Sequence, residues 1–176
     1  IKRVAESYGA SVPFLRNRFA DDYSHAVSAT LETVERLLGR NGSAFSSVVQ
    51  LMPVCPLRSA ASIVAAADFF LKDPQRTAVV SANKPLFQPP WWAAEVDSSG
   101  QPEYLFSSKL SWRSQDLPDL YLPNGAVWIS DVEALRGSGT FYSEGHRLFE
   151  IPWRESLDID SHEDFEFAEM VRGRMH

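Results

Sequence analysis

The sequence predicts an α/β fold built on one largely parallel sheet with helices packed against it. Short apolar runs typical of buried strands alternate with longer amphipathic stretches, so that two strand–helix units lead into a third strand. In addition, 44% of the 176 residues are hydrophobic, which is enough to bury a core in one domain without disulfides. Sheets of this kind bind ligands outside the carboxyl ends of their strands, so functional residues are expected there.

The first half of the chain supplies the two strand–helix units. Residues 1–9 resemble the last turns of a helix that ends at Gly9, so we expect further sequence upstream of Ile1. The elements expected next are a strand at 11–15, a helix at 25–38 ended by Gly39, a strand at 45–52, a helix N-capped by Ser59 and running to about Lys72, and a strand at 77–82.

Residues 83–117 differ in character from the rest of the chain. They are rich in proline and aromatic residues and carry the turn DSSGQ between two β-prone segments, which predicts a β-hairpin excursion from the main sheet. The aromatic side chains can pack within the excursion, pack against a second subunit or surround a ligand, and packing is favoured over a ligand cage. We take a homodimer formed partly through this insertion as the working hypothesis.

The second half returns to the sheet and ends in a helix. Ser161 is a suitable N-cap for that helix, and Asp164 three residues later completes a variant of the capping box. The expected elements are a strand at 124–129, a short helix at 131–137, a strand at 146–152 and a closing helix at 161–174. The whole of 1–176 is therefore interpreted as one domain that carries the 83–117 insertion.

Charge and cysteine content restrict the function classes. Seventeen Lys and Arg against 23 Asp and Glu give a formal charge of -6, which argues against a general polyanion-binding surface but allows one focused cationic pocket. Nucleic acid is not expected as a partner. The single Cys55 excludes an internal disulfide and favours a reducing compartment, so a cytoplasmic location is expected. The longest apolar run is too short to span a membrane, and no serine-hydrolase, P-loop or GxGxxG motif occurs.

The first candidate site is the segment SLDID. Leu157, Asp158, Ile159 and Asp160 alternate as in an extended chain, which places both carboxylates on one side. Two convergent carboxylates at the ligand edge suit Mg²⁺, which typically takes one or two carboxylates together with substrate phosphates. Alternatively, Asp160 only favours the positive end of the following helix while Asp158 is solvated. Spacing alone leaves both interpretations open.

The second candidate is the loop PVCPLRSA. It places Arg58 at the entrance of the helix that follows, where a guanidinium and free backbone N–H groups can together meet an anionic ligand. Alternatively, Arg58 pairs with a surface carboxylate. Cys55 in the same loop is interpreted as a small packing residue, because no histidine partner is indicated nearby.

The third candidate is Asn124 with Gly125 at the start of a strand. Asparagine offers both a donor and an acceptor to a polyhydroxylated ligand, and glycine lets such a ligand approach the backbone. Alternatively, Asn-Gly is simply a common turn pair.

Taken in order, the segments YGASVPFLR, MPVCPLRSAASI, AVVSA, QDLPDLYLPNGAVWI and ESLDIDSHEDFEFAE resemble the acylneuraminate cytidylyltransferases and their pseudaminic and legionaminic acid relatives. The resemblance covers nearly the whole chain. It implies a Rossmann-like nucleotidyltransferase domain with a three-layer α/β/α sheet and a dimer built partly through the excursion. It also implies that CTP and a nine-carbon acidic sugar react in the presence of Mg²⁺ to give a CMP-sugar and pyrophosphate.

The same resemblance implies roles for individual residues. In the family, two aspartates hold the metal, an arginine contacts the nucleotide, and several side chains meet the sugar. The matching positions are Asp158 and Asp160 for the metal, Arg16 for the nucleotide, Asn124 for the sugar, Phe141 and Tyr142 near the acyl group, and Arg113 beside the arginine that receives the sugar carboxylate. Arg58 of the PLR motif is a candidate catalytic residue that joins Arg16 and Arg113 in the expected cationic pocket.

Several positions depart from the family pattern. Met52 stands where a glutamine usually contacts the sugar, and Leu122 stands where some members carry arginine, so a sugar less hydroxylated than N-acetylneuraminate is expected. Ser114 stands where many members carry a second basic residue. The family's opening strand and phosphate loop are expected to precede Ile1. Two alternatives follow, a catalytically silent sugar-binding or oligomerising partner and a CMP-Kdo synthetase.

Overall fold

In the computed structural model, which describes residues 1–21, 23–40 and 45–174, four strands form the central sheet in the order β1-β5-β2-β6. These strands are β1 (Ser47–Gln50), β5 (Leu122–Asp131), β2 (Ala78–Asn83) and β6 (Arg147–Glu150). All four were expected from the sequence. The α/β fold class is thereby confirmed.

The sheet is mixed rather than largely parallel, which corrects the sequence-based expectation. Strands β1, β2 and β6 run the same way, but β5 lies between β1 and β2 and is antiparallel to both. The reason is the excursion. Because the chain leaves the sheet at the end of β2 and re-enters at the same edge, where Asn83 pairs with Leu122, β5 must run back along its neighbour.

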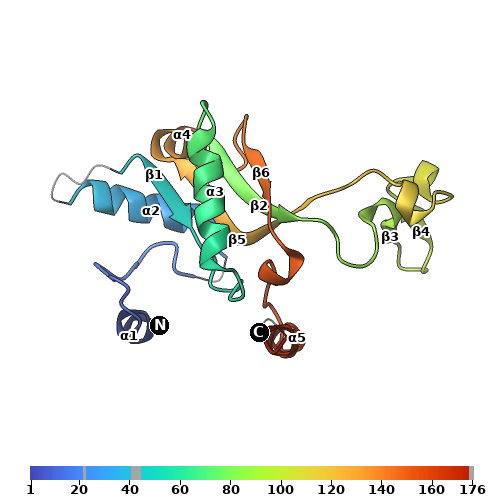
Figure 1. Ribbon diagram of the computed structural model, residues 1–176, viewed down its shortest axis with the longest axis horizontal. Coiled ribbons are helices and arrows are strands. Elements are labelled where there is room, and N and C mark those ends of the chain that lie inside the picture. The colour runs from blue at the N-terminus through green and yellow to red at the C-terminus, as the bar shows by residue number, and fades with distance from the viewer. Residues whose placement is uncertain (22, 41–44, 175–176) are drawn as a thin grey trace.

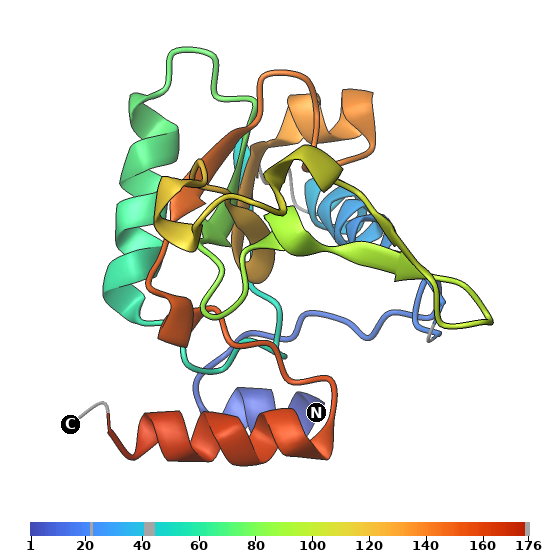
Figure 2. The same cartoon turned by 90° about the vertical axis from the view of Figure 1, so that its right-hand side faces the viewer.

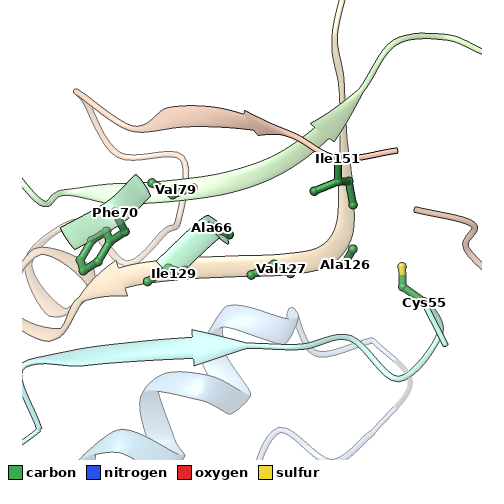
Figure 3. Packing of buried hydrophobic residues seen from close by; sticks show 8 residues of the cluster. All are labelled: Cys55, Ala66, Phe70, Val79, Ala126, Val127, Ile129 and Ile151. Carbon is green, nitrogen blue, oxygen red and sulfur yellow. The ribbon is translucent and has the colours of Figure 1, made fainter. Parts of the chain in front are cut away.

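Helices cover both faces of the sheet, as a three-layer arrangement requires. Figure 2 shows α3 (Ala60–Lys72) on one side and α2 (Ala26–Leu38) with α4 (Val132–Ser138) on the other. Successive residues of a strand point to opposite faces, so Val79 joins Phe70 of α3 in one buried cluster while Val80 joins Phe141 in the other. The first cluster extends to Cys55, at the edge of the sheet where β1 and β2 end (Figure 3).

The strand expected at 11–15 is absent, and this prediction was wrong. The segment has extended sequence character but pairs with no strand. Its carbonyl groups are satisfied by arginines of α2 and its C-cap region instead, since Arg36 Nη1 donates to Leu15 O (3.2 Å) and Arg40 Nη1 donates to Pro13 O (2.9 Å). The Arg36 guanidinium also lies 3.7 Å from the centroid of the Phe14 ring.

The excursion is present and stands apart from the sheet in Figure 1. Strands β3 (Ala94–Val96) and β4 (Pro102–Tyr104) pair antiparallel as the DSSGQ turn predicts, with Gly100 at φ +85°. Many of its large apolar side chains are exposed, among them Phe87 at 79%. The three short 3₁₀ helices of the excursion are η1 (Pro90–Trp92), η2 (Ser107–Lys109) and η3 (Ser114–Asp116).

Two helices lie off the sheet at the ends of the chain, α1 (Lys2–Ser7) and α5 (His162–Arg172), and η4 (Trp153–Glu155) precedes α5 (Figure 1). The capping box at Ser161 is confirmed, because Ser161 Oγ accepts from the Asp164 N–H and the Asp164 carboxylate accepts from the Ser161 N–H. Within the described residues, no helix combines the length and apolarity that crossing a membrane requires.

Candidate functional site

The candidate site lies at the edge of the sheet where β1, β2 and β6 end and β5 begins. Backbone hydrogen bonds hold its segments together. The Met52 N–H donates to Gly125 O (3.2 Å), and the Ile159 N–H donates to Val54 O (3.0 Å). The loop that follows β1, the start of β5 and the segment before α5 are therefore adjacent, although more than 100 residues separate Val54 from Ile159 in the sequence.

The two aspartates occupy this edge with the alternation that their spacing predicts. Asp158 and Asp160 are exposed, while Leu157 and Ile159 are partly buried. Asp158 Oδ1 lies 3.6 Å from Cys55 Sγ and so faces the loop after β1. Asp160 directly precedes the capping box, where its N–H donates to Asp164 Oδ2 (3.2 Å).

These two carboxylates suit a hard cation, provided that a substrate supplies further ligands. Within the described residues, no group of three or more His, Cys, Asp or Glu side chains is placed to hold a metal. Carboxylate oxygens are preferred ligands of Mg²⁺, which usually keeps waters and takes only one or two carboxylates alongside phosphate oxygens. Asp158 and Asp160 fit that pattern.

Cys55 is a packing residue, as the sequence indicated. It has no exposed surface, and burial raises its pKa to about 12, with the negative charge of Asp158 adding to the effect. A thiol in this state is protonated at neutral pH and is a poor nucleophile.

Arg58 stabilises the loop that precedes it. Its Nη1 donates to the carbonyl oxygens of Met52 and Cys55, the latter at 2.9 Å. Burial lowers its pKa relative to that of a free arginine. Pairing with a surface carboxylate, the alternative left open by the sequence, does not occur among the described residues. In the part of the chain that the structure describes, the Arg58 guanidinium therefore has no carboxylate within 4.0 Å.

Two of the backbone N–H groups at the start of α3 already have partners within the chain, whereas those of Ala60 and Ala61 have none among the described residues, so the expectation for this loop holds in part. The Ser59 N–H donates to Glu155 Oε2 (2.9 Å), and the Ser62 N–H donates to Ser59 Oγ (3.1 Å). Partial burial acts to raise the pKa of Glu155, but hydrogen bonds from Ser59 and Ser62 outweigh it, and the pKa lies below its ordinary value. The Glu155 carboxylate therefore takes one of the donors that a ligand anion was expected to use, and it ties the aspartate-bearing segment to α3.

Glu155→Ala is expected to lower the free energy of unfolding by about 1–3 kcal/mol, because the Ser59 N–H loses a charged acceptor. Since the pKa of Glu155 is depressed in the folded protein, its contribution is present above the ordinary glutamate pKa of 4.5 and is lost as the pH falls through the lower folded value. Urea unfolding of both forms between pH 3 and pH 7 measures this. Glu144→Ala, at an exposed position, is the matched control. An equal loss of stability in the two variants would contradict the contact's importance.

Gly125 is required for close packing of the chain itself, which corrects the expectation that a ligand approaches the backbone there. A Cβ at this position would lie 3.0 Å from Met52 Cγ, 3.2 Å from Met52 Cβ and 3.4 Å from Cys55 Sγ. The space above the glycine is thus filled by the loop after β1.

Gly125→Ala is expected to destabilise the protein by about 1–3 kcal/mol through overpacking against Met52. In the Met52→Ala background, Gly125→Ala should destabilise the protein less than it does in the wild type, because the clashing side chain is gone. Gly137→Ala on α4 is the control, since a Cβ there meets nothing within 4 Å. Thermal unfolding measures all four forms, and simple additivity of the two site mutations would refute the clash.

Arg16 and Met52 share the wall of a cavity of about 600 Å³ between α2, β1 and residues of the 16–21 segment. Arg16 Nη1 donates to Phe19 O (2.8 Å), which holds the guanidinium at the cavity wall. The nucleotide-contacting arginine expected from the sequence therefore lies on the same side of the sheet edge as the loop after β1.

The aromatic pair divides into a core residue and a surface residue. Phe141 is only 1% exposed and packs against Trp128 with ring centroids 5.3 Å apart, whereas Tyr142 is 46% exposed, with its centroid 5.8 Å from that of Trp128. Trp128 Nε1 also donates to Asn124 O (2.6 Å). Trp128 thus connects the pair to Asn124, a link that sequence reasoning missed.

Arg113 lies between η2 and η3 of the excursion, which stands apart from the sheet (Figure 1). Its guanidinium donates to both carboxylate oxygens of Asp116, at 2.7 and 3.0 Å. Within one protomer the structure does not bring Arg113 together with the other candidate residues.

Comparison with known proteins gives consistent results in sequence and in structure. The chain is 31% identical to a CMP-N,N'-diacetyllegionaminic acid synthase of Legionella pneumophila and 27% identical to a pseudaminic acid cytidylyltransferase of Campylobacter jejuni, in each case over 97% of this chain and 73% of the relative. No family model matches.

A solved CMP:2-keto-3-deoxy-manno-octonic acid synthetase complexed with CTP superposes with a TM-score of 0.62 at 11% identity, over 99% of this chain and 77% of the other. This likeness bears on the fold alone, and it confirms the Rossmann-like nucleotidyltransferase sheet. The sequence relatives bear on the family. The chain therefore belongs to the acylneuraminate cytidylyltransferase family, together with the pseudaminic and legionaminic acid enzymes.

Proposed function

We propose that this protein transfers CMP from CTP to a nine-carbon acidic sugar of the legionaminic or pseudaminic type and releases pyrophosphate. The observation that carries the proposal is the meeting of Asp158, Arg58 and Asn124 at one edge of the sheet, in a chain that shares 31% of its residues with a CMP-N,N'-diacetyllegionaminic acid synthase. Carboxylates, a cation and an amide are the groups needed to bind a metal, a phosphate and a sugar.

In the reaction, the anomeric hydroxyl of the sugar attacks the α-phosphorus in line, and the bond to the departing pyrophosphate breaks. Positioning and charge neutralisation dominate the catalysis of such transfers, so the buried, protonated Cys55 is not needed as a nucleophile. Asp158 and Asp160 are the residues that would hold Mg²⁺, which neutralises phosphate charge when bound. Arg16 and Arg58 supply positive charge to the nucleotide, and Asn124 binds the sugar.

The sugar-facing positions favour a substrate with few hydroxyl groups. Met52 and Leu122 are apolar where polar side chains would bind further hydroxyls, and Met52 also packs against Gly125. Tyr142 is the exposed member of the aromatic pair and is proposed to contact the acyl group of the sugar.

The exposed apolar side chains of the excursion support a homodimer formed through it. Arg113 can reach a sugar carboxylate only if the excursion of one protomer meets the site of another, so its role depends on this dimer. The buried free thiol suits a reducing compartment, and we infer a cytoplasmic location.

Incubation of the protein with CTP, Mg²⁺ and a panel of acidic sugars tests the proposal, with pyrophosphate release and product mass as the readouts. The expected result is a CMP adduct of a legionaminic- or pseudaminic-type sugar. A CMP adduct of an eight-carbon acid alone would identify the protein as a CMP-Kdo synthetase. Sugar binding by calorimetry without any turnover would favour the silent partner.

A further inference from the structure

Four polar side chains form a continuous hydrogen-bond network around Asn124, the residue proposed to bind the sugar. Ser81 is fully buried on β2, Asn83 ends that strand, Asn124 lies in β5, and Ser156, at 9% exposure, follows η4. The contacts run from Ser81 Oγ to Asn124 Oδ1 (2.6 Å), from Asn124 Nδ2 to Asn83 Oδ1 (3.0 Å) and from Ser156 Oγ to Asn83 Oδ1 (2.9 Å). Three separate segments are thereby joined at one amide.

The direction of these hydrogen bonds is fixed by backbone groups, which can only donate or only accept. The Ala126 N–H donates to the Asn124 side chain (3.2 Å), so the atom that receives it must be Oδ1. The Val127 N–H donates to Ser81 Oγ (2.9 Å), which leaves the Ser81 hydroxyl hydrogen free to bind Asn124 Oδ1. The Ala126 N–H requires the orientation of the Asn124 amide in which Nδ2 faces Asn83, and the Ser81 hydroxyl, which also lies 3.3 Å from the Asn124 backbone oxygen, is compatible with it.

Asn83 is oriented by the same logic at the other end of the network. Its Nδ2 donates to the backbone oxygen of Lys84 (2.9 Å), which turns Oδ1 toward Asn124 and Ser156. Asn83 Oδ1 then accepts from Asn124 Nδ2 and shares the Ser156 hydroxyl hydrogen with Trp153 O (2.8 Å). If the Asn83 amide were flipped, its Nδ2 would face Asn124 Nδ2, donor against donor, and its Oδ1 would face the Lys84 oxygen, acceptor against acceptor. Only one orientation of the Asn83 amide is therefore permitted.

This polarity limits what Asn124 can do toward a ligand. Its Oδ1 already accepts two hydrogen bonds, and one Nδ2 hydrogen is used by Asn83. Among the described residues, the second Nδ2 hydrogen is the part of the amide that has no partner. Asn124 is thus a donor of one hydrogen bond, and the ligand atom that it meets must be an acceptor oxygen.

The network also replaces regular strand pairing. The register between β2 and β5 shifts between Val80 and Ala82, at Ser81, where the serine hydroxyl takes the Val127 N–H. Irregular pairing of this kind is over-represented next to functional sites, where it redirects a side chain. Here it places the Ser81 hydroxyl within hydrogen-bond distance of Asn124 Oδ1 (2.6 Å).

We propose that Ser81, Asn83 and Ser156 are positioning residues that hold the Asn124 amide as a one-way hydrogen-bond donor to an acceptor oxygen of the acidic sugar, a carboxylate or an acyl carbonyl. The identity of the ligand rests on the proposed function, whereas the orientation of the amide does not.

Two substitutions of Asn83 separate positioning from packing. Asn83→Asp loses the donor to Lys84 O but keeps an acceptor for Asn124 and Ser156, whereas Asn83→Leu removes both donor and acceptor. The expected result is a KM for the sugar that rises about 10- to 100-fold in Asn83→Leu but less than about threefold in Asn83→Asp, with the KM for CTP unchanged in both. Ser138→Ala, on α4, is the control. A sugar analogue lacking the acyl group distinguishes the two acceptor oxygens, because only contact with the acyl carbonyl makes the effect vanish.

The side-chain amide resonance of Asn124 in a ¹⁵N-labelled protein supplies a readout that does not need turnover. The resonance, assigned through its loss in Asn124→Asp, should shift in Asn83→Leu and stay close to the wild-type position in Asn83→Asp. If the two Asn83 variants give the same resonance, or change both KM values and thermal stability in parallel, the positioning role is overturned. If the wild-type protein makes no CMP-sugar while the resonances behave as expected, the proposed function fails and the orientation of Asn124 stands.

Discussion

Replacing Asp158 and Asp160 together with asparagine is expected to abolish CMP transfer while leaving the fold intact. A bound cation stabilises transition-state charge by several kcal/mol, so its loss lowers the rate by about 10³-fold or more. The fold should survive because both side chains are exposed and because asparagine retains an oxygen that can accept from the Cys55 thiol. Pyrophosphate release measures turnover, and circular dichroism with thermal unfolding measures the fold.

Calorimetry adds a test of the metal itself. Wild-type protein should bind CTP more tightly with Mg²⁺ than with a chelator, and the double variant should show no such difference. The matched control is Glu166→Gln with Glu169→Gln, which removes the same charge from α5 at exposed positions. Retained turnover in the aspartate variant, or an equal loss in the control, would remove the aspartates from the proposed site.

The elements that the sequence predicted well are those fixed by local interactions. Ser59 caps α3 through a hydrogen bond to a residue three positions away, and the Ser161 capping box spans the same short distance. The hairpin turn before Pro102 is equally local. Such signals lie within one turn of chain, so they remain legible without knowledge of the fold.

The features that the sequence could not predict depend on contacts between distant segments. Glu155 reaches the Ser59 N–H across 96 positions, and nothing in the PLRSA motif indicates that this donor at the helix start is already occupied. The missing strand at 11–15 has the same cause, because strand formation depends on a partner, and Arg36 of α2 and Arg40 just after it donate to its carbonyls instead.

The candidate site shows the same division. The alternation around Asp158 and the packing role of Cys55 follow from local pattern and chemistry, and the structure agrees with both. Gly125 was assigned to a ligand because glycine signals a close approach without naming what approaches. The structure identifies the partner as Met52, on a loop more than 70 residues earlier in the chain.

Phe141→Ala is expected to destabilise the protein by about 3–5 kcal/mol, the largest stability effect among these predictions. Phe141 is 1% exposed and belongs to the buried cluster with Val80 and Leu135, so truncation leaves a cavity under Trp128. Tyr142→Ala should cost less than about 1 kcal/mol, because the side chain is 46% exposed. Urea unfolding of the two variants measures the difference, and Phe141→Leu, which fills most of the cavity, should recover part of the loss.

The same two variants decide how the aromatic pair acts on the sugar. If Tyr142 is the contacting ring, Tyr142→Ala raises the KM for the sugar while its stability loss stays below about 1 kcal/mol, whereas Phe141→Leu leaves that KM close to the wild-type value. Phe141 then acts only through Trp128, whose indole N–H holds the Asn124 carbonyl. A buried ring can influence a ligand only by moving its neighbours, and such a movement would also change the free energy of unfolding. A sugar KM that rises in Phe141→Leu while the free energy of unfolding stays constant would therefore contradict this assignment.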